Sequence, residues 1–185
     1  ASIHPIHSFA NPENSIANLK KVPFAIEGDA EAINLLNHLC IAIGGQPFAI
    51  NSASKSLYHA ATVMACNNLV SLLEISKGML VQAGVDVKHS GNPLDLLIQQ
   101  TVTNYLSSGA QKALTGPIAR GDVDTVASHL LALQSTPDGW QDAYRGLGKM
   151  AVNISAKQGQ ASPEQLQDIL QLLNIDPNNQ TVDTT

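Results

Sequence analysis

Polar and ionisable side chains recur along the segment KSLYHAATVMACNN, residues 55–68, at spacings that suit chemistry. At about 100° per residue, Lys55, His59, Thr62 and Cys66 fall within one narrow sector of a helix, and Asn67 lies roughly a third of a turn away. A lysine or a histidine can give or take a proton on a reacting heteroatom, and histidine titrates near neutral pH. We therefore treat Lys55, His59 and Asn67 as the candidate catalytic residues.

The helix that must position these side chains is predicted to run without a break from residue 55 to about residue 83. Its other side chains are mostly apolar and spread around most of the circumference, which is typical of a helix buried on several sides. They are Leu57, Ala60, Val63, Met64, Leu69, Leu72, Leu73, Ile75, Met79 and Leu80. A lysine, a histidine or an amide on such a helix must be satisfied by partners or used by a ligand.

The residues before this helix are predicted to be α/β. Pro5 holds His4 in extended backbone at the end of a possible first strand, and residues 22–28 and 46–52 have the pattern of strands. Between these two strands, Asp29 is the expected N-cap of a helix that ends at Gly44. We expect residues 1–53 to be a short α/β remnant with two or three strands and one helix.

All later signals are helical. Further helices are expected over residues 92–107, from Asp122 to about residue 134, from Thr136 to about residue 154, and after a capping box that begins at Ser162. A loop bracketed by glycines is expected over residues 113–122, and residues 177–185 are expected to form a frayed tail. The sequence thus predicts a mainly α fold, in which residues 54–176 form an all-helical domain.

The composition argues against several kinds of protein. Ten Lys and Arg against 15 Asp and Glu give a net charge of -5 without a run of like charge, so we expect no nucleic-acid partner. No apolar run reaches the roughly 18 residues of a membrane span, so we expect no membrane partner either. Cys40 and Cys66 have no zinc-binding spacing and fit a reduced, cytoplasmic setting, although a disulfide between them stays open. His4 and His7 make a poor metal pair in extended backbone, so we expect no metal site.

Four segments together resemble a known family. They are HPIHSFA at residues 4–10, FAIEGD at 24–29, KSLYHAATVMACNNLVSLL at 55–73 and ALTGPIARGDVDTVASHL at 113–130. In this order they look like a family of uncharacterised bacterial proteins in which a Rossmann-like nucleotide domain precedes a helical domain of unknown function. That family is grouped with the 6-phosphogluconate dehydrogenase C-terminal-domain-like proteins, alongside ketopantoate and pyrroline-5-carboxylate reductases.

The resemblance implies an NAD(P)-dependent oxidoreductase that acts on a small carbonyl, imine or hydroxy-acid substrate, with NADP or NAD as cofactor. Residues 1–53 would be the incomplete tail of the nucleotide domain, because no GxGxxG occurs and the glycine-rich loop should lie upstream of Ala1. By itself the chain is therefore expected to bind a dinucleotide poorly and to be inactive without an upstream nucleotide domain. The helical domain, residues 54–176, would be the dimerisation and substrate domain, and we expect it to form a homodimer.

The resemblance also implies roles for single residues. In better-known relatives, a lysine and an asparagine one turn apart on the first long helix act on the substrate. Lys55 matches that lysine, but His59 stands where the asparagine would be, and Asn67 comes three turns after Lys55. His4 and Ser8 are placed on a loop near the cofactor ring, so we expect them to bind substrate.

Arg120 is a further candidate for substrate binding, because it lies on a loop framed by two glycines. Its planar guanidinium could hold a carboxylate or a phosphate, either within one chain or across a dimer interface. If the protein is an enzyme, Lys55, His59 and Arg120 should converge on one concavity. Hydride transfer to a carbonyl or imine carbon also needs a proton on the heteroatom, which Lys55 or His59 could supply.

Structural interpretations stay open for each of these residues. Lys55 could extend its ammonium group into water, His59 could be a satisfied interior histidine, Asn67 could cap a kink, and Arg120 could pair with Asp122. Two function classes stay open in the same way. The chain is either the substrate and dimerisation part of an oxidoreductase or a non-catalytic helical module that dimerises or binds a small ligand.

Overall fold

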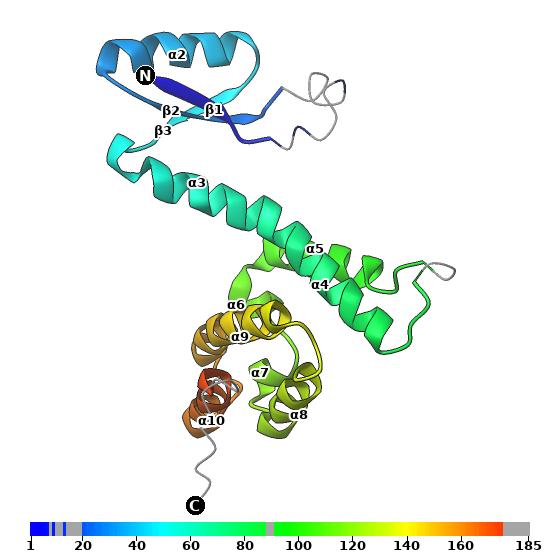
Figure 1. The fold of residues 1–185 in the computed structure, drawn as a ribbon. Helices are drawn as coiled ribbons and strands as arrows, with labels where there is room; N and C mark the ends of the chain where they lie inside the picture. The colour runs from blue at the N-terminus through cyan, green and yellow to red at the C-terminus, as the bar shows by residue number, and fades with distance from the viewer. Residues whose placement is uncertain (8, 10–12, 14–19, 88–90, 176–185) are drawn as a thin grey trace, which may run out of the picture. The chain divides into compact units, whose positions relative to one another are not determined.

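The computed structural model describes residues 1–7, 9, 13, 20–87 and 91–175. The chain divides into two compact units, Ala1–Glu74 and Ile75–Thr185, and each is described by itself (Figure 1). The first unit holds a three-stranded sheet, and the described part of the second unit is helical. The predicted mainly α fold with a small N-terminal sheet is therefore confirmed. The expected domain boundary after residue 53 stays a prediction, and the tail expected over residues 177–185 lies outside the described residues.

The sheet of the first unit has the order β1-β2-β3. Strand β1 (Ser2–Pro5) is antiparallel to β2 (Pro23–Glu27), and β3 (Gln46–Ala49) is parallel to β2. Helix α2 (Ala30–Ala42) makes the connection between the two parallel strands. It begins at the predicted N-cap, since the carboxylate of Asp29 accepts the backbone N–H of Ala32 at 2.9 Å.

Side chains alternate between the two faces of this sheet because successive residues of a strand point in opposite directions. One face packs against α2 in a small buried core formed by Val22, Phe24, Ile26 and Cys40. Between β1 and β2 the register pairs Ser2 with Glu27 and His4 with Ala25, and between β2 and β3 it pairs Ala25 with Phe48. Paired side chains lie on the same face of a sheet, so these five residues share the other face. Helix α3 begins on that second side of the sheet, opposite α2 (Figure 1).

The long helix differs from the prediction in two ways. A short 3₁₀ turn, η1 (Ser52–Ser54), leads into α3 (Lys55–Val63), which continues as a π-helical segment, η2 (Met64–Asn68), and then as α4 (Leu69–Gln82). The expected unbroken α-helix therefore contains a π segment. None of its side chains is buried in the single chain, and Leu57 is 75% exposed, so the expectation of burial on several sides is wrong for one copy of the chain.

The second unit contains α5 (Asp95–Ser108), α6 (Ala110–Ala113), α7 (Pro117–Arg120), α8 (Val123–Leu133), α9 (Asp138–Gln158) and α10 (Pro163–Asn174). Two predicted caps are confirmed. Asp122 accepts the backbone N–H of Thr125 at the start of α8, and Ser162 forms a complete capping box with Gln165 at the start of α10. The loop expected over residues 113–122 is partly helical, because Pro117 at the first helical position starts the single turn of α7.

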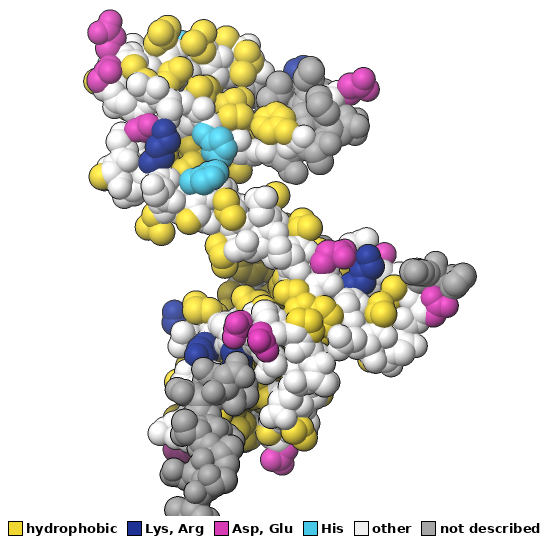
Figure 2. Space-filling model, in the orientation of Figure 1, with side chains coloured by type: hydrophobic (Ala, Val, Ile, Leu, Met, Phe, Trp, Pro, Cys, Tyr) yellow, Lys and Arg dark blue, Asp and Glu magenta, His cyan; other side chains and the backbone are white. Residues whose placement is uncertain are grey.

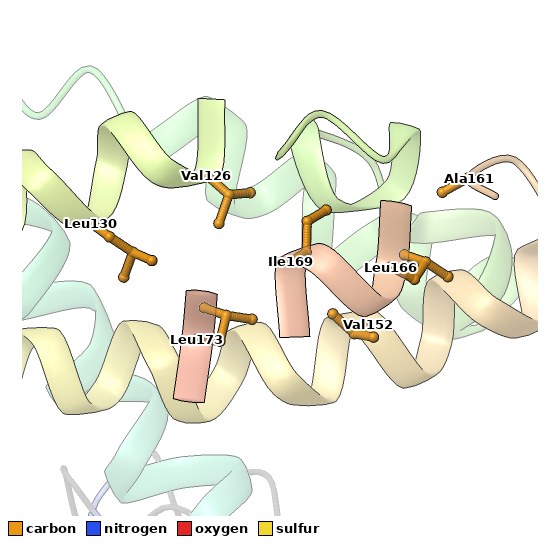
Figure 3. Close-up of a cluster of buried hydrophobic side chains, with 7 residues drawn as sticks. All are labelled: Val126, Leu130, Val152, Ala161, Leu166, Ile169 and Leu173. Carbon is orange, nitrogen blue, oxygen red and sulfur yellow. The ribbon is translucent and has the colours of Figure 1, made fainter. Parts of the chain in front are cut away.

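Helices α8, α9 and α10 enclose the main apolar core (Figure 3), which consists of Val126, Leu130, Val152, Ala161, Leu166, Ile169 and Leu173. Val126 and Leu130 lie one turn apart on α8, and Ile169 and Leu173 lie one turn apart on α10, so each helix presents one stripe to the core. Helix α4 meets α9 where Gly78 faces the indole ring of Trp140.

Helix α5 stands apart from this core. Its large apolar side chains Leu96, Leu97, Val102, Tyr105 and Leu106 are exposed, and Leu106 is 77% exposed. At about 100° per residue these five side chains are spread around most of the circumference of the helix, and the described part of one chain does not cover them. In the described ranges, we find no helix that combines the length and apolar character of a membrane span.

Candidate functional site

Polar side chains gather where the uncovered face of the sheet meets the first turn of α3. The ammonium group of Lys55 lies 2.9 Å from a carboxylate oxygen of Glu27 and 2.8 Å from the hydroxyl of Ser2. The Ser2 hydroxyl in turn donates to the same carboxylate oxygen at 2.8 Å. Because the register sets Ser2 opposite Glu27, the two strands hold both groups in place for Lys55. This network fixes the start of α3 against the sheet.

The carboxylate of Glu27 is strongly stabilised in its charged form. Hydrogen bonds from Ser52, Lys55 and Ser2 lower the pKa of Glu27 from 4.5 to about 2. The Glu27 side chain is only 14% exposed, whereas that of Lys55 is 52% exposed. Glu27 therefore remains an anion at neutral pH, and its charge is balanced by the lysine beside it.

A group of aromatic rings lies next to this network. The imidazole Nδ1 of His4 is 2.7 Å from the hydroxyl of Tyr58, and the two rings meet edge to face. The ring of His59 lies 6.0 Å from that of His4, and the ring of Phe48 lies 6.4 Å from that of Tyr58. Figure 2 shows histidine side chains side by side on the first unit, with a basic and an acidic side chain next to them.

The contact between His4 and Tyr58 is made by Nδ1 of the imidazole ring. Burial raises the pKa of Tyr58, so its phenol keeps its proton at neutral pH. The phenol can donate to Nδ1 or accept from it, and the tautomer of His4 decides which of the two occurs. In the tautomer in which Nδ1 accepts from the phenol, Nε2 carries the ring proton and offers an N–H donor to a ligand.

The structure brings three of the predicted site residues together in the first unit. Lys55 and His59 lie one turn apart on α3, and His4 reaches the same region from β1. Asn67 lies further along the same helix, within the π segment. Ser8 lies outside the described residues, so its role stays a prediction.

Arg120 lies in the second unit, at the end of α7. Its side chain is 62% exposed, and its Nη2 is 4.0 Å from a carboxylate oxygen of Asp122, the N-cap of α8. The pairing with Asp122 that the sequence analysis left open is therefore present as a long ion pair. Such an exposed pair contributes little to stability, and it leaves donors of the guanidinium for a ligand.

Sequence reasoning missed Glu27, Ser2 and Tyr58. A signal was present for each of them, because Ser2 and His4 alternate on one strand and Tyr58 lies three residues after Lys55. Glu27 ends a strand that is otherwise apolar, which makes it a natural partner for a nearby cation. The pairing of β1 with β2 that brings these residues together is not readable from local spacing.

The N-terminus of α2, which follows strand β2 directly, does not fit the phosphates of a dinucleotide. In nucleotide-binding βα units, the pyrophosphate lies at the N-terminus of that helix. Here the carboxylate of Asp29 occupies the N-terminus of α2, and Glu31 adds a second acidic group in its first turn. Within the ranges that the structure covers, no three His, Cys, Asp or Glu side chains lie close enough to hold a metal ion.

Comparison with known families gives one match that covers most of the chain. Residues 22–151 match the model of a domain of unknown function, DUF2520. No protein with a curated description matches the chain.

Two solved structures are similar to the chain. The crystal structure of protein TM1727 from Thermotoga maritima superposes with a TM-score of 0.71 at 27% identity over 85% of this chain and 62% of that one. The crystal structure of BF3122 from Bacteroides fragilis, described as a putative NADP oxidoreductase, gives a TM-score of 0.59 at 19% identity over 84% of this chain and 55% of that one. The chain thus spans less than two thirds of the length of either protein.

Proposed function

Because this chain belongs to the DUF2520 family, we propose that it forms the substrate-binding and dimerisation part of an NAD(P)-dependent oxidoreductase. Its substrate would be a small molecule with a carbonyl, imine or hydroxy-acid group. The likeness to a Bacteroides protein described as an NADP oxidoreductase supports this proposal. The same proposal includes membership of the group of 6-phosphogluconate dehydrogenase C-terminal-domain-like proteins.

The observation that carries the proposal is the pairing of His4 with Tyr58 beside the ring of His59. Reduction of a carbonyl or an imine needs a proton on the oxygen or nitrogen, and oxidation of an alcohol must remove one. Nε2 of His4 is a suitable donor in the tautomer in which Nδ1 accepts from the tyrosine. His59 supplies a second imidazole ring, 6.0 Å from that of His4.

In this proposal, Lys55 is not the proton donor. Its ammonium group is already bound by Glu27 and Ser2, so transfer of its proton would leave the Glu27 carboxylate without its cation. Lys55 is therefore a positioning residue that holds the first turn of α3, and with it Tyr58 and His59, against the sheet.

The redox cofactor of the proposed enzyme is NADP or NAD, and its phosphates would be held by residues other than those of α2. When bound, it would supply the hydride. The contribution of this chain is to orient the substrate and to move the proton at His4 or His59.

Calorimetry tests the proposal directly. NADP and NAD are titrated into this chain and into a longer form that includes any nucleotide domain preceding it in the gene. We expect binding to the longer form only, followed by turnover in a screen of small 2-oxo acids, imines and hydroxy acids. The His4→Gln variant should lower kcat by about a hundredfold or more. A matched control is His38→Gln, an exposed histidine on α2, which should leave kcat unchanged. Full turnover by His4→Gln would overturn the assignment.

The exposed apolar side chains of α5 support a homodimer as part of the same proposal. The helix carries five exposed large apolar side chains, while Asp95 is its one charged residue. Exposed apolar surface of this composition is typical of a subunit contact. In light scattering, Leu106→Glu should convert a dimer into a monomer, whereas Leu131→Glu, an exposed leucine on α8, should not. A monomeric wild-type chain at high micromolar concentration would contradict the dimer.

A second candidate function is a non-catalytic module that dimerises or binds a small ligand. The observation that favours it is the engagement of Lys55 by Glu27, since the lysine that matches the reacting lysine of the relatives is then structural. Failure of both the short and the longer form to bind NADP or NAD would favour this alternative.

A further inference from the structure

The π-helical segment η2 changes the direction in which Asn67 points along the long helix. Asn67 follows His59 by eight residues, which in a regular α-helix make two full turns and about 80° more at about 100° per residue. Asn67 would then lie about 80° around the helix axis from His59. A π-helix closes its hydrogen bonds from i to i+5, so it turns less per residue than an α-helix. The π segment over Met64–Asn68 therefore rotates Asn67 towards the side of the helix that carries His59.

Along the helix axis, His59 and Asn67 are separated by about 12 Å at roughly 1.5 Å per residue. Between them lie Thr62 and Val63, which are both half-buried. The Thr62 hydroxyl donates to the backbone carbonyl of His59 and is therefore engaged within the helix.

The side-chain amide of Asn67 is available for a ligand. It makes no hydrogen bond to the rest of the described chain, and its backbone carbonyl accepts from Ser71 as in an ordinary helix. Its neighbour Asn68 differs, because the amide of Asn68 donates to the sulfur of Met64 at 2.8 Å. π segments interrupt α-helices rarely and are frequent at functional sites.

We propose that Asn67 is a specificity-determining residue that binds the far polar end of an elongated substrate. This inference rests on the proposed function, since the reacting carbonyl or hydroxyl group is taken to lie at His4 and His59. A substrate that reaches both ends must place a second polar group roughly 10 Å from its reacting carbon. The amide of Asn67 can donate to a carboxylate or accept from a hydroxyl or an amide at that position.

A series of linear 2-oxo dicarboxylic acids, from oxaloacetate through 2-oxoglutarate to 2-oxosebacate, tests this inference with the chain as it is. The readout is the dissociation constant of each acid, followed by the NMR signals of the imidazole rings of His4 and His59. We expect the affinity of the wild-type chain to rise about tenfold from the shortest to the longest acid. In Asn67→Ala this rise should disappear, so that the longest acid binds no more tightly than oxaloacetate.

Two further variants separate a binding role from a structural one. Asn68→Ala removes the neighbouring amide and should keep the rise in affinity with chain length. Asn67→Asp keeps the size of the side chain but places a negative charge beside the far carboxylate of a long acid. It should therefore lower the affinity for the long acids only. A purely structural Asn67 would instead lower the affinity for short and long acids alike.

The possible outcomes are distinct. A length-dependent affinity that survives in Asn67→Ala overturns the role of Asn67, as does an affinity that is independent of length. Both of these results leave the proposed function intact. If no acid of the series perturbs the imidazole signals of His4 and His59, both the inference and the proposed 2-oxo acid substrate class are overturned.

Discussion

Replacement of Gly78 by alanine should destabilise the second unit, although alanine is the better helix former. A Cβ at residue 78 would lie 2.4 Å from Cη2 and 2.7 Å from Cζ2 of Trp140, whereas carbon atoms in contact normally lie about 3.5–4.0 Å apart. The rigid indole must therefore move by about 1 Å, and such overpacking costs about 2–3 kcal/mol. The gain in helix propensity offsets about 1 kcal/mol of this, which leaves a net loss of about 1–2 kcal/mol.

Gly146 of α9 supplies the matched control, because no atom lies within 4 Å of a Cβ built there. Gly146→Ala should gain about 1 kcal/mol from propensity alone, so the two variants should differ by about 2–3 kcal/mol. Urea unfolding followed by the fluorescence of Trp140, the single tryptophan of the chain, measures both free energies of unfolding. Equal stability of Gly78→Ala and Gly146→Ala would refute the packing of α4 against α9 through this glycine.

Three further predictions concern the first unit and the helical core. Since the pKa of Glu27 falls from 4.5 to about 2 on folding, its contacts stabilise the first unit fully above pH 4.5, and this contribution is lost as the pH falls towards 2. Lys55→Met should raise the pKa of Glu27 towards 4.5 and weaken this acid dependence, which NMR titration of the carboxyl carbon and acid unfolding would measure. Ile169→Ala should cost about 2–5 kcal/mol in urea unfolding, because Ile169 is fully buried in the core of α8, α9 and α10. Ser162→Ala should cost about 1 kcal/mol through loss of the capping box of α10, seen as a lower melting temperature.

Features of the fold that depend on local hydrogen bonds could be predicted from the sequence. Asp29, Asp122 and Ser162 each cap the helix that follows them, because a short polar side chain at that position satisfies a backbone N–H two or three residues later. The π segment could not be predicted, since its residue types do not distinguish i→i+5 from i→i+4 hydrogen bonds. Apolar periodicity predicted the helix α5, but it did not reveal what covers its apolar side chains.

The candidate site was predictable only in part, for a related reason. Lys55 and His59 are neighbours through the period of a helix, which spacing in the sequence reveals. Glu27 and Ser2 meet Lys55 through the pairing of β1 with β2, which joins residues 25 positions apart. Spacing along the helix does not single out Tyr58, because only the position of His4 on β1 gives the tyrosine hydroxyl a partner.

The mixed sheet of the first unit leaves both outer edges without a strand partner in the part of the chain that the structure describes. An unpaired edge is a template on which another strand can add, and proteins often protect such edges with proline. β1 carries Pro5 and β3 carries Pro47, and each proline removes one N–H donor that an added strand would need. Edge-to-edge growth into aggregates is therefore hindered on both sides. A partner strand could still add along β3 in a parallel direction, provided that its own hydrogen bonds avoid the nitrogen of Pro47.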